Sequence, residues 1–134
     1  MSQRGLKTFW ILSAFALTAA LAVVFFWDPA THSFYPRCML HQATGFYCPG
    51  CGVLRATHEL LHGNVVSAVR FNPLFVLSVP LVLIYGATRQ LGILRKQEVR
   101  HSPAIKWVWA VAFVIIAFGV VRNLPFDTLA WMRP

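Results

Sequence analysis

Three cysteines in one short segment are the residues of this chain best suited to chemistry. Cys48 and Cys51 are three positions apart with Pro49 between them, and Cys38 lies upstream. Two thiols at this spacing can form a redox-active disulfide or bind a metal. We expect a helix to begin at Pro49, which would place Cys48 at the positive end of a helix dipole and stabilise its thiolate.

Three chemistries remain open for these thiols. A redox couple is one, although the βαβ pattern of thioredoxin-like proteins is absent. A zinc site is the second, with the three cysteines as ligands and a fourth from His41, His58 or His62. The third is structural, with a disulfide or packed thiols bracing a tight turn. We favour the structural interpretation and expect no cofactor, with zinc as the alternative. The odd cysteine count leaves one thiol free, metal-bound or paired between chains if the compartment is oxidising.

A second motif follows within the same segment. The residues from His58 to His62 read H-E-x-x-H, in which two histidines bind zinc and Glu59 acts as the base of a metalloprotease. However, we expect the helix to end at Gly63, and no third ligand is evident. The alternative is a pair of histidines at the end of an interfacial helix, which we prefer.

Three arginines are candidate anion ligands, namely Arg55, Arg70 and Arg122. Guanidinium groups at one membrane boundary can bind a phosphate or carboxylate in a bidentate manner. The alternative, contact with lipid headgroups, is the one we favour. Other motif positions are assigned to turns and helix ends rather than to ligands. These are Pro49, Gly50, Gly52, Gly63, Asn72 and Pro73.

The composition indicates a membrane protein. Of 134 residues, 57% are hydrophobic and only 12% are charged, and the mean hydropathy is +0.60. Soluble domains carry roughly 25% charged residues. The formal net charge is +8, but the basic residues cluster between apolar runs. They are therefore interpreted as topology signals and contacts with anionic lipid headgroups, and nucleic acid is not an expected partner.

Three apolar runs predict an all-α membrane protein with a single integral membrane domain, residues 1–134. The predicted spans are about 9–27, 73–94 and 104–121, each near the ~20 residues that a helix needs to cross the hydrocarbon layer. The first run is too long for a signal-peptide core of about 7–15 residues, so we expect it to be retained. Basic residues before the first span and between the second and third predict a cytoplasmic N-terminus in a bacterial inner membrane.

Between the first two spans, the pattern predicts a short helical hairpin that bears the Cys-Pro-Gly-Cys element. Helical spacing covers about 49–62, and Asn64 precedes a second short helix, Val65–Phe71. Asn72 and Pro73 then open the second span as N-cap and first-turn proline. Residues 30–47 read as turns. Neither short helix can span a bilayer, so segment 49–71 is either surface-lying or re-entrant.

The ordered motifs of this segment resemble the DUF2752 family of small bacterial integral membrane proteins. The resemblance covers about residues 38–85 and extends loosely to residues 122–126. It rests on the following pieces: Thr44-Gly45, Cys48–Gly52, Arg55-Ala56, Leu61–Gly63 and Asn72–Leu74. It implies an all-helical membrane protein and assigns no activity.

Two classes of function are compatible with these features. The first is a scaffold or partner subunit, in contact with another membrane protein, whose C-x-x-C element is structural. The second is a membrane thiol–disulfide or metal-dependent enzyme that acts at the extracytoplasmic face. In the first class the cysteines contribute only stability, whereas in the second their loss removes activity from a folded protein.

Overall fold

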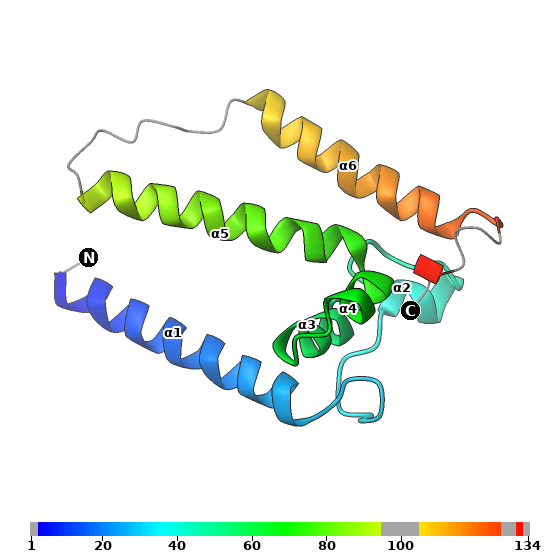
Figure 1. The fold of residues 1–134 in the computed structure, drawn as a ribbon, viewed down its shortest axis with the longest axis horizontal. Coiled ribbons are helices and arrows are strands. Elements are labelled where there is room, and N and C mark those ends of the chain that lie inside the picture. The colour runs from blue at the N-terminus through cyan, green and yellow to red at the C-terminus, as the bar shows by residue number, and fades with distance from the viewer. Residues whose placement is uncertain (1–2, 95–104, 127–130, 133–134) are drawn as a thin grey trace.

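The described part of the chain is entirely helical. The structure, a computed structural model, describes residues 3–94, 105–126 and 131–132. Three long helices and three short ones follow in the order α1 (Gln3–Phe26), α2 (Met39–Thr44), α3 (Val53–Leu61), α4 (Val65–Phe71), α5 (Pro73–Leu94) and α6 (Ile105–Asn123). This confirms the predicted all-α class, with three long apolar helices and short helices between the first two (Figure 1).

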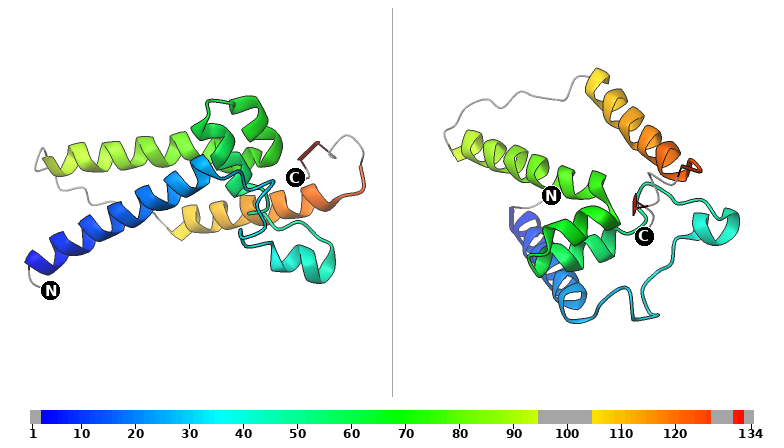
Figure 2. Two further views of the ribbon diagram at one scale, coloured as in Figure 1. Left: turned by 90° about the horizontal axis from the view of Figure 1, so that it is seen from below. Right: turned by 45° about the vertical axis from the view of Figure 1, so that its right-hand side comes forward.

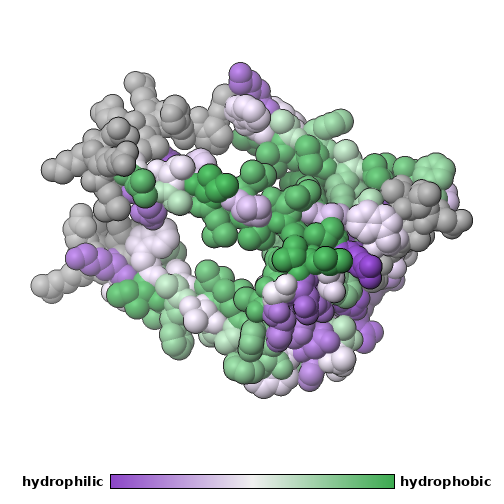
Figure 3. Space-filling view, viewed as in Figure 1, coloured by the Kyte–Doolittle hydropathy of each residue, from purple (hydrophilic) through white to green (hydrophobic). Residues whose placement is uncertain are grey.

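Each long helix contains a stretch that is long and apolar enough to cross a membrane. These stretches are Lys7–Phe26, Pro73–Gly92 and Ile105–Asn123. Only 6%, 0% and 6% of the residues in their most apolar parts are buried, respectively. Their side chains therefore face outward along most of each stretch. Hydrophobic side chains cover these helices in Figure 3, whereas hydrophilic ones gather below the short helices. This surface suits lipid contact. The basic connection 95–104, used above to predict topology, lies outside the described residues.

The long helices converge at one end of the molecule. In Figures 1 and 2, α1 ends, α5 begins and α6 ends near the three short helices, while the N-terminus lies at the opposite end. A single membrane boundary therefore holds the loop after α1, the short helices and the last turn of α6.

The hairpin of α3 and α4 forms the small core at this end. Gly63 adopts a left-handed conformation (φ 80°) after α3. Its N–H donates to Leu60 O, and the Asn64 N–H donates to Glu59 O. These two bonds form a Schellman motif, which ends a helix and satisfies its last carbonyls. Ala56 of α3 and Ala68 of α4 are fully buried where the two helices pack.

Asn72 and Pro73 connect this hairpin to α5 as the sequence predicts. The Asn72 backbone is extended, which suits a residue before proline. Its side-chain Oδ1 accepts a hydrogen bond from the Phe75 N–H at 3.0 Å, capping the first turn of α5.

Two local predictions are wrong. No helix begins at Pro49, because the chain makes a turn in which the Cys51 N–H donates to Cys48 O at 3.0 Å. Gly52 follows in a left-handed conformation (φ 84°), so α3 starts only at Val53. In addition, the turn-like segment 30–47 contains the helix α2.

Gly119 lets α6 approach the cysteine turn. A Cβ at this position would lie 3.0 Å from Cγ of Pro49, whereas a Cβ at Gly86 of α5 would meet nothing within 4 Å. Because a side chain here must displace the proline ring, we expect Gly119→Leu to lower the melting temperature in detergent by several degrees, as overpacking costs about 1–3 kcal/mol. Gly86→Leu is the matched control and should melt like the wild type. Equal melting of both variants would contradict the close approach.

Candidate functional site

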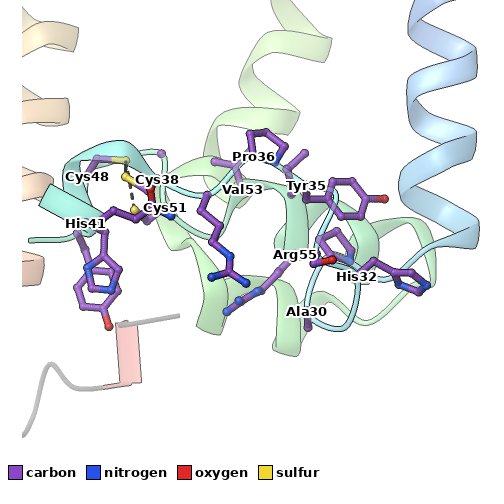
Figure 4. A pocket seen from close by; sticks show the side chains of 18 of the residues that line it. Ala30, His32, Tyr35, Pro36, Cys38, His41, Cys48, Cys51, Val53 and Arg55 are labelled. Carbon is purple, nitrogen blue, oxygen red and sulfur yellow. Dashed lines mark hydrogen bonds between the residues drawn. The ribbon is translucent and has the colours of Figure 1, made fainter. Parts of the chain in front are cut away.

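The three cysteines meet at the membrane-boundary end of the molecule. Cys38 precedes the first residue of α2, and Cys48 and Cys51 lie on the turn before α3. Cys48 Sγ lies 3.3 Å from Cys38 Sγ and 3.3 Å from Cys51 Sγ (Figure 4). All three sulfurs lie within 4.8 Å of one another, and all three residues are free cysteines. We call this set the thiol cluster.

Arg122, at the end of α6, fixes the backbone of this turn. Its side chain is fully buried. Nη1 donates to Cys51 O at 2.8 Å and to Cys48 O at 3.4 Å, and Nη2 donates to Phe71 O at 2.9 Å. The third nitrogen, Nε, donates to Met132 O at 2.8 Å. One guanidinium thus joins α6, the cysteine turn, the end of α4 and the C-terminal segment.

Two asparagines complete this support. Asn72 is also fully buried, and its Nδ2 donates to Pro49 O at 2.8 Å and Cys51 O at 3.1 Å. Asn123 Nδ2 donates to Tyr47 O, and its Oδ1 accepts from the Tyr47 N–H, both at 2.8 Å. These side chains hydrogen-bond the backbone of the turn. The backbone that carries Cys48 and Cys51 is therefore held in place without a bound ligand.

The environments of the thiols differ across the cluster. The His41 backbone beside Cys38, together with the Cys51 and Cys48 thiols, lowers the pKa of Cys38 to about 6. Burial raises the pKa of Cys51 to about 12, and hydrogen bonding with Cys38 and Cys48 acts in the same direction. Cys38 therefore loses its proton more readily than Cys51.

A cavity of about 650 Å³ opens beside the thiol cluster. Its walls are the cysteine turn, the start of α3 and the loop that follows α1. Tyr35 holds this loop against α1, because its hydroxyl donates to Trp27 O at 2.7 Å and to Val23 O at 3.2 Å. In Figure 4, Arg55 lies between the thiol cluster on one side and His32 and Tyr35 on the other.

The predicted histidine ligands lie apart from the cluster. Nδ1 of His58 hydrogen-bonds with Val24 O at 2.7 Å, and the His62 ring stacks on Phe25 with centroids 4.4 Å apart. Both residues thus join α3 to α1. The His41 ring lines the cavity but stacks on Tyr47. Among the described residues, the thiol cluster is the one group of three His, Cys, Asp or Glu with ligand atoms close enough to share a metal, so the H-E-x-x-H motif has no third ligand there.

The three candidate arginines do not form one site. Arg55 lines the cavity, Arg70 is exposed on α4, and Arg122 is buried with its nitrogens bonded to carbonyl groups. Sequence reasoning missed Arg37, which lines the same cavity as Arg55. The sequence feature that could have identified Arg37 is its position next to Cys38, in a segment that otherwise carries few charges.

Replacing Arg122 by alanine should strongly destabilise the site end of the protein. The change removes one donor from the carbonyl groups of the turn, of Phe71 and of Met132, although Cys48 O and Cys51 O each keep a second donor. Each buried group that is left unsatisfied costs about 1–3 kcal/mol. We expect a large fall in the melting temperature in detergent, and a smaller one for Arg122→Lys, which keeps the charge but loses the planar fork. Arg70→Ala, on an exposed residue, should melt like the wild type. If Arg122→Ala also melts normally, the turn does not depend on this residue.

Comparison with known proteins relates part of this chain to a family. Neither the curated proteins nor the solved structures contain a match to this chain. Residues 38–86 match the family described as "Protein of unknown function (DUF2752)", a segment that holds the thiol cluster, Arg55, α3, α4 and the first part of α5. The match confirms, over residues 38–86, the resemblance drawn from the motifs.

Proposed function

We propose that this membrane protein binds one zinc ion through Cys38, Cys48 and Cys51 and acts through that metal at the membrane boundary. The observation that carries the proposal is the separation of the sulfurs. Zn–S bonds of 2.3 Å in a tetrahedron place the sulfurs about 3.8 Å apart. The observed contacts of 3.3 Å and the outer limit of 4.8 Å bracket this value.

The surroundings support a metal over a merely bracing role. Ligand sites work when the supporting residues fix the ligands in advance. Here Arg122, Asn72 and Asn123 bond the backbone of the turn on both sides of Cys48. Three thiolates and one Zn²⁺ carry a net charge of −1, and the buried Arg122 guanidinium offsets it.

The fourth coordination position of such a zinc ion would be open to the cavity. All three cysteines line the cavity, so water or a ligand group in the cavity can reach a metal that they hold. Catalytic zinc sites keep one such position open, whereas structural sites fill all four with protein ligands. The geometry therefore favours the metal-dependent class of function over the purely structural one.

A scaffold or partner subunit remains the second candidate. The observation in its favour is the exposure of the three long helices along their membrane-crossing stretches. Such surfaces can be covered by lipid or by the helices of another membrane protein. A scaffold needs only the fold, so its activity should follow stability in every cysteine variant.

Metal analysis tests the zinc site. We expect about one zinc per chain in protein purified without added chelator, and three reactive thiols once it is denatured with chelator. Cys51→Ser should reduce bound zinc at least tenfold, because the site loses a thiolate. The double variant His58→Ala/His62→Ala is the control and should keep its zinc. A metal-free protein with one free thiol would instead establish a disulfide between two of the cysteines.

Topology is tested by labelling intact cells. We propose that the N-terminus is cytoplasmic in a bacterial inner membrane and that the thiol cluster faces outward. Seven of the twelve Lys and Arg residues lie either before the first span (Arg4, Lys7) or between Arg89 and Lys106, which favours this orientation. In a background with all three cysteines changed to serine, an impermeant maleimide should label Thr31→Cys and spare Gln97→Cys. Both should react after permeabilisation. The reverse pattern in intact cells would invert the proposed orientation.

A further inference from the structure

The cavity beside the thiol cluster is basic. Two arginines, Arg37 and Arg55, and two histidines, His32 and His41, are among its lining residues. Among the residues that the structure describes, no aspartate or glutamate lines it. Asp28, near the start of the same loop, accepts a hydrogen bond from the Ala30 N–H at 2.7 Å and does not reach the cavity wall. The two arginines give this part of the lining a permanent positive charge that attracts anions.

The two arginines of the cavity have unused donors. Within the described residues, neither Arg37 nor Arg55 makes an ion pair or a hydrogen bond. Arg55 is half-buried, and its guanidinium carbon lies 5.9 Å from the centre of the Phe71 ring. This contact uses the face of the group and leaves its N–H edge for a ligand. Arg122 differs, because its donors are bound to backbone carbonyls.

We propose that this cavity binds a phosphate group through Arg37 and Arg55. A planar guanidinium matches two phosphate oxygens in a bidentate manner, which an ammonium group cannot do. Two guanidinium groups can together bind several oxygens of one phosphate group, whereas a carboxylate offers only two. The inference deepens the proposed function, since it names the ligand class of the same site, but its contacts involve the arginines and not the metal ligands.

The volume indicates that the phosphate belongs to a larger molecule. The cavity of about 650 Å³ falls within the range of roughly 300–1,000 Å³ that is typical of small-molecule sites. Its lining also includes apolar residues such as Val53 and Leu54. Because the site lies where the long helices end, the phosphate can come from a lipid headgroup or from a soluble phosphorylated compound. The two sources share the arginine contacts.

Two binding measurements test the proposal and separate the sources. In the first, inorganic phosphate is titrated into the full-length protein in phosphatidylcholine nanodiscs, and binding is followed by calorimetry. In the second, native mass spectrometry counts the phosphatidylglycerol molecules retained by protein from nanodiscs that contain this lipid. Arg55→Gln and Arg37→Gln are compared with Arg70→Gln, which changes an exposed arginine of α4 outside the cavity. Arg37 is exposed, so its variant tests the site even if Arg55→Gln folds poorly.

We expect Arg55→Gln and Arg37→Gln each to weaken binding about tenfold, the scale of a lost charge-assisted contact, while Arg70→Gln behaves like the wild type. Phosphate binding that phosphatidylglycerol does not reduce would identify a soluble ligand. Arginine-dependent retention of the lipid would identify a headgroup. Binding of neither, or binding equal in all variants, would overturn the proposal. Zinc content is measured in the same samples, so loss of the metal with intact phosphate binding would refute the zinc site alone.

Discussion

A single buried guanidinium determines the arrangement of this end of the protein. Arg122 donates to backbone carbonyl groups of the cysteine turn, of the end of α4 and of the C-terminal segment. It also lies against the rings of Tyr47 and Phe118, 5.8 and 5.5 Å from their centres. Burying a charge is costly unless its donors are satisfied. The carbonyl groups around Arg122 meet this need, and in return they are held in one conformation.

This arrangement explains why the cysteine turn is not a helix. In a helix, the carbonyls of Cys48 and Cys51 would accept from backbone N–H groups further along the chain. Here Cys48 O accepts from the Cys51 N–H, which closes a turn, and from Arg122, while Cys51 O accepts from Arg122 and Asn72. Gly52 then takes the left-handed conformation, and α3 starts at Val53. The turn can then place the Cys48 sulfur between the other two. The lowered pKa of the Cys38 thiol comes first from the His41 backbone at the start of α2 and then from the Cys51 thiol.

Sequence patterns predicted those features that depend on local order along the chain. Hydropathy located the three spans, and the chemistry of Gly63 and Asn72 located a helix end and a helix start. Local patterns could not distinguish the exposed Arg70 from the buried Arg122. Arg122 is buried where it hydrogen-bonds to Cys48 and Cys51, which precede it by 74 and 71 positions in the chain. The same limit hid Arg37, whose place in the cavity depends on how the loop after α1 folds back. The helix expected at Pro49 was wrong because tertiary hydrogen bonds outweighed its local propensity.

The convergence of the spans has a mechanical consequence. The last turns of α6 contact the segment around the cysteine turn through Gly119, Arg122 and Asn123. A helix of 19 residues is about 28 Å long. A tilt of about 10° about these last turns would move the opposite end of the helix by about 5 Å, given the rise of a helix.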